Sequence, residues 1–209
     1  MILKDNDLLF DVRVQKEART LVDAGYDVTV LARKSDRTDF METLDGIKVI
    51  RIPRLFGEPR RLFMEKAIEI DADVYHAHDL HTLDIGFVAA RKTKARLIYD
   101  SHELWKSLTK NYWPKGYLQR FRYRMRERFL IREADYVITV SDSIADILHR
   151  TYGTAKPVVI RNVPRKMSVQ PNDEIRKRLG IAEDKKVLVH VGNVLKSRGL
   201  TPMIEALAA

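Results

Sequence analysis

The chain has no cysteine among its 209 residues. This absence excludes a disulfide framework and any metal site built on thiolates, and it fits an intracellular protein more easily than a secreted one. Long hydrophobic runs are also missing: no stretch of about 18 apolar residues occurs, and the N-terminal MILKDNDLLFDVR has no apolar core followed by small residues. We therefore expect neither a membrane span nor a signal peptide, and we expect a cytoplasmic protein.

Basic residues gather in one segment of the chain. The formal net charge is +9, and residues 115–132 hold seven Lys or Arg against one acid, Glu127. This segment has the pattern of an amphipathic helix, with an apolar stripe on one side and a charged face on the other. We expect the stripe to consist of Leu118, Phe121, Met125 and Phe129, and the opposite face to contain Arg120, Arg124 and Glu127.

Two interpretations of this basic helix stay open. It is either a solvated surface helix or a surface for an anionic partner. A membrane with acidic lipids suits the aromatic residues that stand among the arginines, Tyr117, Tyr123 and Phe129. Such a partner would make the protein peripheral on the inner face of a membrane. The sequence has no recognition module for nucleic acid, so we expect no nucleic-acid partner.

Short apolar segments rich in β-branched residues alternate with helical patterns. This alternation predicts an α/β fold with a parallel sheet covered by helices on both faces. One helical segment, 14–25, ends at Gly25, and another, 141–153, begins at a serine cap, Ser141 or Ser143, and ends at Gly153. The predicted strands are 26–32, 47–52, 72–78, 95–100, 135–140, 157–162 and 186–192.

Both ends depart from this regular alternation. Only MILK precedes the polar loop DNDLLFD, so we expect the first strand to be nearly absent and the N-terminus to be clipped. Near the other end, the proline-punctuated stretch 163–171 is followed by a fresh strand and helix. We therefore expect a first domain over residues 1–165, and over residues 166–209 a linker with the opening strand and helix of a truncated second domain.

Polar residues follow the predicted strands. In an open parallel sheet, ligands bind outside the carboxyl ends of the strands, so these positions are candidates for a site. Some also have an ordinary structural interpretation, such as Ser141 and Asp142 as helix caps or Asn162 as a turn former. The candidates are His78, Asp79 and His81; Asp100, Ser101, His102 and Glu103; Ser141 and Asp142; Arg161 and Asn162; and Gly192, Asn193, Lys196, Arg198 and Gly199.

Three of the six histidines lie in the segment HAHDLHTL, residues 76–83. His76 and His78 alternate onto one face of a strand, and His81 follows, so a metal site is one interpretation. The spacing is similar to the H-x-H-x-D-H signature of metallo-β-lactamase-like hydrolases, but Asp79 falls one position early. The alternatives are therefore a metal-dependent hydrolase on His76, His78 and His81, or a metal-free site in which His76 is structural.

Six segments follow one another along the chain: DVRVQKEARTLVDAGYDVTVL, DVYHAHDLHTL, LIYDSHELW, ADYVITVSDSIADIL, PVVIRNVP and VLVHVGNVLKSRGLTPMIEALA. Together they resemble a family 4 glycosyltransferase with the GT-B fold. The resemblance implies two Rossmann-like domains that face each other across a cleft. The first domain binds mainly the acceptor, and the second binds mainly the nucleotide-sugar donor. The chain would be the first domain with the opening strand and helix of the second.

The resemblance also implies an activity. Members of the family transfer a sugar, as in a hexosyltransferase, from a nucleotide-sugar to a hydroxyl with retention of anomeric configuration. No metal and no cofactor are needed beyond the nucleotide-sugar co-substrate. The acceptor would be a saccharide or a lipid-linked molecule in polysaccharide or glycoconjugate biosynthesis. The paired glutamates that hold the donor in this family would lie beyond residue 209, so we expect the isolated chain to be inactive. A non-catalytic binding module with the same fold is the remaining alternative.

The resemblance assigns roles residue by residue. His102 would lie beside the transferred sugar and its phosphate, with Asp79 as its catalytic companion at the neighbouring strand end. Asn193 replaces an arginine of the family, and Arg198 stands where the family has a lysine. The expected substrate-binding residues are Arg13, His78, Glu103, Ser141 and Asn162, and the expected donor diphosphate-binding residues are Gly192, Asn193, Lys196 and Arg198.

Overall fold

The computed structural model describes residues 1–53, 60–104, 115–164, 166, 168, 170, 172–192, 194 and 199–208. The chain divides into two compact units, Met1–Pro164 and Arg165–Ala209. Within the part of the chain that is described, no helix has both the length and the apolar character needed to cross a bilayer.

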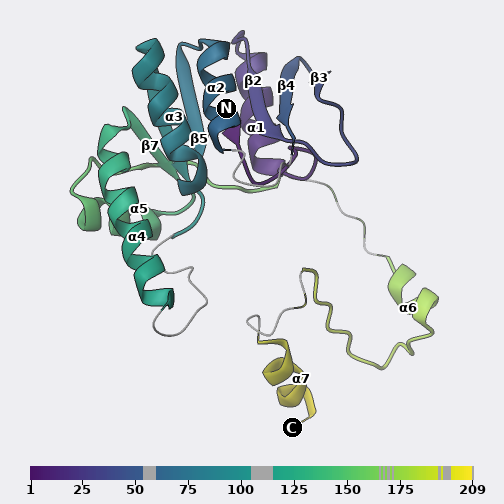
Figure 1. Ribbon diagram of the computed structural model, residues 1–209. Helices are drawn as coiled ribbons and strands as arrows, with labels where there is room; N and C mark the ends of the chain where they lie inside the picture. The colour runs from purple at the N-terminus through teal and green to yellow at the C-terminus, as the bar shows by residue number, and fades with distance from the viewer. Residues whose placement is uncertain are drawn as a thin grey trace. The chain divides into compact units, whose positions relative to one another are not determined.

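The first unit is built on one eight-stranded sheet in the order β3-β4-β2-β1-β5-β6-β7-β8 (Figure 1). Seven of these strands run parallel, and only β3 is antiparallel to its neighbour. This is the predicted α/β Rossmann-like class, which is confirmed. The strands are β1 (Ile2–Leu3), β2 (Thr29–Arg33), β3 (Met41–Leu44), β4 (Ile47–Ile52), β5 (Val74–His78), β6 (Arg96–Ser101), β7 (Tyr136–Thr139) and β8 (Val158–Val159).

The strand that we expected to be nearly absent is present and central. It has two residues, Ile2 and Leu3, which pair with β2 on one side, and Ile2 also pairs with β5 on the other. Both side chains are buried, because consecutive residues of a strand point to opposite faces of a sheet that is covered on both sides. Two residues are therefore enough to join the two halves of the sheet.

Helices cover both faces of this sheet. On one face, Leu3, Val30 and Ala32 pack against Val14 and Ala18 of α1. The other face forms a larger core, in which strand residues such as Ile2 and Leu31 belong to the same cluster as residues of the other helices. The helices of the first unit are α1 (Val12–Asp23), α2 (Arg60–Ile70), α3 (Leu80–Thr93), α4 (Lys115–Leu130), which continues into the 3-10 turn η2 (Ile131–Glu133), and α5 (Asp142–Tyr152).

The antiparallel strand β3 was not predicted. It pairs with β4 through a tight turn at Asp45 and Gly46, both of which have a positive φ. An Asp-Gly pair between two short strands favours this hairpin, so the signal was present in the sequence. The prediction missed it because residues 41–44 alternate between exposed and half-buried at the sheet edge and have no continuous apolar run.

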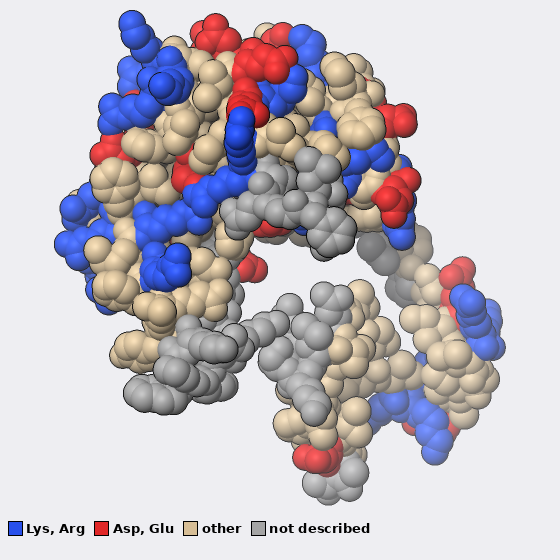
Figure 2. All heavy atoms as spheres, viewed as in Figure 1, with Lys and Arg blue, Asp and Glu red and all other residues tan. Residues whose placement is uncertain are grey.

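Helix α4 forms as predicted, and Glu127 lies opposite the apolar stripe as expected, but the stripe is exposed and Glu127 is buried. Leu118, Phe121 and Phe129 are each about 60% exposed, whereas Glu127, expected on the charged outer face, is 1% exposed. The Glu127 carboxylate accepts hydrogen bonds from the hydroxyls of Tyr99 (2.8 Å) and Tyr152 (2.6 Å). These two donors make burial of the carboxylate tolerable, so the helix turns its apolar stripe outward. Figure 2 shows basic side chains gathered over this helix with other residues between them.

The second unit holds α6 (Glu174–Leu179) and α7 (Leu200–Ala208). The predicted strand 186–192 was wrong, because these residues lie in no strand, and Val191 is 90% exposed. A strand needs a neighbour to pair its backbone groups, and no other strand occurs among the described residues of this unit.

Candidate functional site

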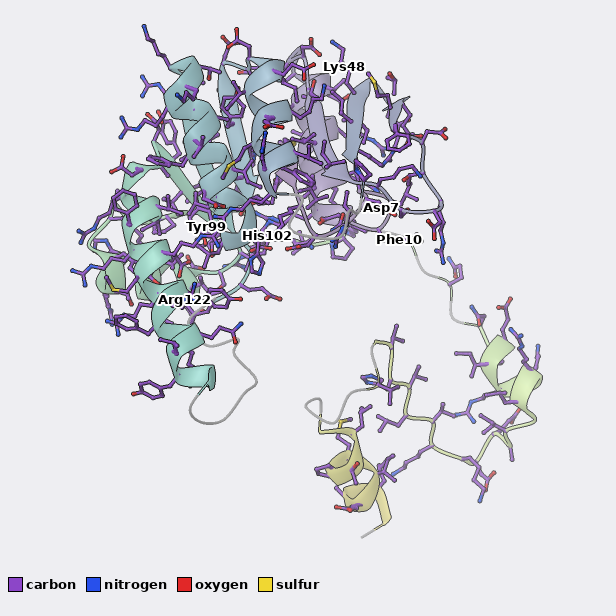
Figure 3. All side chains as sticks on the ribbon, viewed as in Figure 1. Asp7, Phe10, Lys48, Tyr99, His102 and Arg122 are labelled. Atoms are coloured by element: carbon purple, nitrogen blue, oxygen red, sulfur yellow. The ribbon has the colours of Figure 1, made fainter. Side chains whose placement is uncertain are left out.

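A cavity of about 590 Å³ opens at the carboxyl ends of the parallel strands. In Figure 3, His102 lies with Asp7 and Phe10 along one edge of the sheet, and Lys48, near the start of β4, lies at the opposite edge. The cavity brings together five of the residues predicted to act in catalysis or substrate binding. Its lining residues are Asp11, Arg13, His102, Glu103, Val140, Ser141, Arg161 and Asn162.

Arg13, which lines the cavity, forms an ion pair with the buried Asp100. Arg13 follows the helix cap Asp11 at the start of α1, and Asp100 is the next-to-last residue of β6. The Arg13 guanidinium donates to the Asp100 carboxylate from Nε (3.0 Å) and from Nη2 (2.9 Å), and from Nη1 to the backbone oxygen of Ile160 (2.6 Å). Both side chains are buried. Arg13 therefore lines the cavity with its donors bound to the protein.

Three imidazoles surround the same carboxylate. Asp100 Oδ2 lies 3.1 Å from His102 Nε2, 3.5 Å from His78 Nδ1 and 3.8 Å from His76 Nε2. Burial alone would raise the pKa of Asp100, but the hydrogen bond from His102 and the close approach of His76 and His78 hold it far below its usual range. Burial lowers the pKa of His76 and of His78, so both are neutral at pH 7. The Asp100 carboxylate is the ionised centre of this group.

His102 differs from the other two histidines. Burial lowers its pKa, but the hydrogen bond to Asp100 and the charges of Asp79 and Asp100 outweigh burial and raise it. Asp79 Oδ1 accepts a hydrogen bond from the His102 backbone N (3.0 Å), and Asp79 Oδ2 lies 3.5 Å from His102 Nδ1. Asp79 reaches this position with a φ of 65°, a conformation that few residues other than glycine adopt. The pair predicted to be catalytic is thus in direct contact, and both carboxylates favour a protonated His102.

Glu17 belongs to the same group and was missed by the sequence analysis. It stands one helical turn after Arg13, with Oε1 3.0 Å from Arg13 Nε and Oε2 4.0 Å from His76 Nε2. Burial and the nearby charge of Asp100 raise the pKa of Glu17 to about 7, although Arg13 acts in the opposite direction. The i, i+4 spacing of an arginine and a glutamate was a visible signal, but it indicates only a helix pair.

One atom each from Glu17, His76, His78 and Asp100 lies within 4.8 Å of the others. Two imidazoles and two carboxylates form a donor set that suits a metal ion. However, the Arg13 guanidinium already lies against both carboxylates. This fixed cation offsets part of their charge and would repel a metal ion at the same place. We therefore interpret the group as a network of ionisable side chains around the Asp100 carboxylate.

His81 is not in this group. It lies on α3, where its ring meets Tyr123 edge-on at 5.9 Å between centroids, so the trio of His76, His78 and His81 does not converge. His76 and His78 instead stack at 4.3 Å inside and at the end of β5. The three-histidine arrangement that the hydrolase interpretation requires does not form.

The remaining candidate residues follow β6, β7 and β8. Ser141 caps α5, because its Oγ accepts a hydrogen bond from the Ile144 backbone N (3.3 Å), as the sequence predicted. Arg161, which is exposed, pairs with the exposed Asp142 (3.0 Å). Asn162 and Glu103 are exposed at the cavity wall.

The predicted donor-side residues belong to the second unit. Gly192 is exposed, with a φ of 148°. Asn193, Lys196 and Arg198 lie outside the described residues. Their predicted contact with a diphosphate stays a prediction.

Residues 11–164 match a protein family described as Glycosyl transferase 4-like domain. No curated protein matches the sequence. Among solved structures, sucrose-phosphate synthase from Thermosynechococcus elongatus is similar, with a TM-score of 0.70 and 17% identity over 99% of this chain and 59% of that chain. A second structure of this enzyme from the same organism has a TM-score of 0.52 and 16% identity, over 86% of this chain and 94% of that chain.

The chain thus spans 59% of the length of the first of these structures. At these identities the likeness shows a shared fold, which is that of a GT-B glycosyltransferase. The family match covers most of the first unit, including all the residues of the cavity wall. The chain belongs to the glycosyl transferase 4-like family, as its six ordered segments predicted.

Proposed function

We propose that the protein transfers a sugar from a nucleotide-sugar donor to a hydroxyl of a saccharide or lipid-linked acceptor, with retention of anomeric configuration. The observation that carries this proposal is the cavity of about 590 Å³ at the carboxyl edge of the sheet, in a chain of the glycosyl transferase 4-like family. Its volume lies in the range of pockets that enclose a small ligand, about 300–1,000 Å³. Its wall offers hydroxyl, amide, carboxylate and imidazole groups, which are the partners of sugar hydroxyls.

His102 is the residue that we assign to the reacting sugar. Its Nε2 is committed to the buried Asp100 at 3.1 Å, whereas Nδ1 is 3.5 Å from Asp79, a distance too long for a good hydrogen bond. Nδ1 is therefore the nitrogen that we expect to donate to a sugar hydroxyl or a phosphate oxygen. Because its pKa is raised, a protonated ring would stabilise negative charge that develops on the departing phosphate.

Arg161 is the second group that we assign to the departing phosphate. It lines the cavity, and its partner Asp142 is exposed, so this pair is a weak surface ion pair that a phosphate could replace. With cationic side chains in place, the transfer would need no metal ion. Gly192, Asn193, Lys196 and Arg198 would supply the remaining contacts to the diphosphate.

We also propose that residues 165–209 do not bind the donor by themselves. Their described part forms no strand, and almost all of its side chains are exposed. A nucleotide needs an enclosed site with convergent donors. We therefore expect little or no turnover by the 209-residue chain alone.

A transfer assay with radiolabelled nucleotide-sugars tests the function. It would compare the 209-residue chain with the same chain joined to the remaining, donor-side part of the sucrose-phosphate synthase that shares its fold. We expect the joined protein to transfer sugar with retention, which NMR of the product would read, and the chain alone to be at least about a hundredfold slower. Transfer with inversion would contradict the proposal. So would the absence of transfer in a joined protein that binds donor and melts cooperatively.

A further inference from the structure

A surface outside the cavity, the outward side of α4, is apolar along most of the helix. Leu118 is 61% exposed, Phe121 59%, Met125 48% and Phe129 59%. These four residues recur at a spacing of three and four, so they form one stripe, which we call the α4 stripe. Met125 precedes the buried Glu127 by two residues, a rotation of about 200° around the helix. Most of the α4 stripe therefore lies opposite the side that packs on the domain, and at its C-terminal end Phe129 meets Phe87 of α3 edge-on at 6.1 Å between ring centroids.

Arginines flank the α4 stripe on both sides. Arg122 lies on one side, and Arg124 and Arg128 lie on the other, and all three are exposed. The single acid of residues 115–132 is Glu127, which is buried beneath the helix and bound by Tyr99 and Tyr152. The exposed side of α4 thus carries cations and apolar groups without a carboxylate, and Figure 2 shows these basic and other side chains interleaved over the helix.

Two buried or half-buried polar links hold the helix in this rotation. Besides the two tyrosine hydroxyls on Glu127, Arg126 forms an ion pair with Asp84 of α3. Turning the stripe inward would bury arginines and expose Glu127, which would leave Tyr99 and Tyr152 without their partner. These contacts therefore hold the α4 stripe on the outside of the domain.

We propose that α4 docks the protein on a membrane surface that contains anionic lipids. The helix has 16 residues and a length of about 24 Å, so it would lie in the plane of the surface. The α4 stripe would enter the boundary between headgroups and acyl chains, and the flanking arginines would bind lipid phosphates. A second copy of the chain fits less well, because two such arginine-rich faces repel each other. A nucleic acid would use the arginines but would leave the apolar side chains in water.

This inference is independent of the sugar-transfer activity, and its test uses binding alone. The 209-residue chain would be sedimented with vesicles of phosphatidylcholine and with vesicles that contain about one-third phosphatidylglycerol. A stripe variant carries Leu118→Ser, Phe121→Ser and Met125→Ser. A charge variant carries Arg122→Glu, Arg124→Glu and Arg128→Glu. The matched control reverses three exposed basic residues outside α4, with Arg37→Glu, Lys94→Glu and Arg150→Glu.

We expect binding that depends on the anionic lipid and is kept by the control. Three arginines at a membrane surface predict a loss on the order of a hundredfold in partitioning for the charge variant. The stripe variant should also lose binding at unchanged charge, which separates a membrane from a polyanion. Circular dichroism and a cooperative melt would show that each variant is folded.

Three results would overturn the proposal. One is equal binding by the wild type and the folded charge variant. Another is full vesicle binding by the stripe variant, which would mean attraction by charge alone. The third is no vesicle binding together with a concentration-dependent dimer in sedimentation velocity that the stripe variant abolishes, because that dimer would show a second copy to be the occupant.

Discussion

Arg13 and Asp100 are 87 positions apart in the sequence and are joined by two guanidinium nitrogens, Nε and Nη2, at 2.9 to 3.0 Å from the carboxylate. The third nitrogen, Nη1, reaches the backbone of Ile160. One side chain thus ties α1 to β6 and to the residue after β8. The same carboxylate lies 3.1 Å from His102 Nε2. The Arg13–Asp100 pair therefore also influences the position and charge of His102, the residue that we assign to the reacting sugar.

Removing either partner of this pair should destabilise the first unit. Arg13→Leu or Asp100→Leu leaves the other charge buried without its partner, at an expected cost of about 3–5 kcal/mol. The double variant should lose much less than the sum of the single losses, because it removes both charges of the pair together. Urea unfolding of the four proteins measures the coupling. Additive losses would mean that the two residues act independently.

The raised pKa of Glu17 predicts a stability that falls as pH rises. The carboxyl has a pKa of about 7 in the folded chain and an ordinary pKa of 4.5. Between these two pH values, the folded state therefore holds a proton that the unfolded state has lost. The stabilisation is complete below pH 4.5 and disappears as pH rises through 7, with a size on the order of 2–3 kcal/mol.

Glu17→Gln, which stays neutral, is the variant that tests this. We expect the variant to gain stability relative to the wild type between pH 5 and pH 8, as measured by urea unfolding at each pH. A difference that stays constant over this range would contradict the protonation of Glu17.

Glu127 should be worth more to stability than an ordinary acid on a helix. Glu127→Ala removes the acceptor of two buried tyrosine hydroxyls and leaves a cavity, so we expect a loss of about 3 kcal/mol. Glu65→Ala on α2 is the matched control, because its ion pair with Arg61 is exposed and such pairs contribute about 0.5 kcal/mol. Thermal unfolding compares the two. Similar losses would show that the buried hydrogen bonds contribute little.

Gly86 lies inside α3 at its contact with the sheet. A Cβ there would lie 2.9 Å from Leu97 Cδ1 and 3.2 Å from Ala77 Cβ. Gly86→Ala gains helix propensity of about 1 kcal/mol, but overpacking at this contact should cost about 1–3 kcal/mol. We expect a net loss of stability in urea unfolding. A more stable variant would mean that α3 can move away from β5 and β6 without cost.

The sequence predicted six strands of the sheet, because they are short apolar segments in a chain where such segments alternate with helical patterns. Strand 47–52 was placed in full, and the ends of most others shifted by one to three residues. Two errors have a physical cause. Segment 186–192 has a strand composition but no partner strand among the described residues of its unit. Glu127 was expected on a charged face, and its burial could not be predicted, because the two tyrosines that donate to it come from β6 and α5, which the helix sequence does not reveal.

The sequence predicted which residues belong to the candidate site better than it predicted the contacts between them. Because parallel strands end at one edge, the residues after them converge, and Arg13, His102, Glu103, Ser141 and Asn162 line one cavity. The sequence could not show that Arg13 and three histidines share a single carboxylate. Those contacts depend on the register of β5 with β6, which places His78 opposite Asp100, and on the position of Arg13 on α1. Glu17 was missed for the same reason.

Sugar transfer after substitution of a single histidine tests most directly whether the sugar reacts in the cavity at the carboxyl edge of the sheet. His102→Ala would be compared with His149→Ala, a histidine on α5 that is exposed and does not line the cavity. Both would be made in the joined protein that carries residues 1–209 with a complete donor-side domain. We expect His102→Ala to lower kcat by about a hundredfold or more, and His149→Ala to leave it unchanged. Equal transfer by both variants would contradict the assignment of the carboxyl-edge cavity as the place where the sugar reacts.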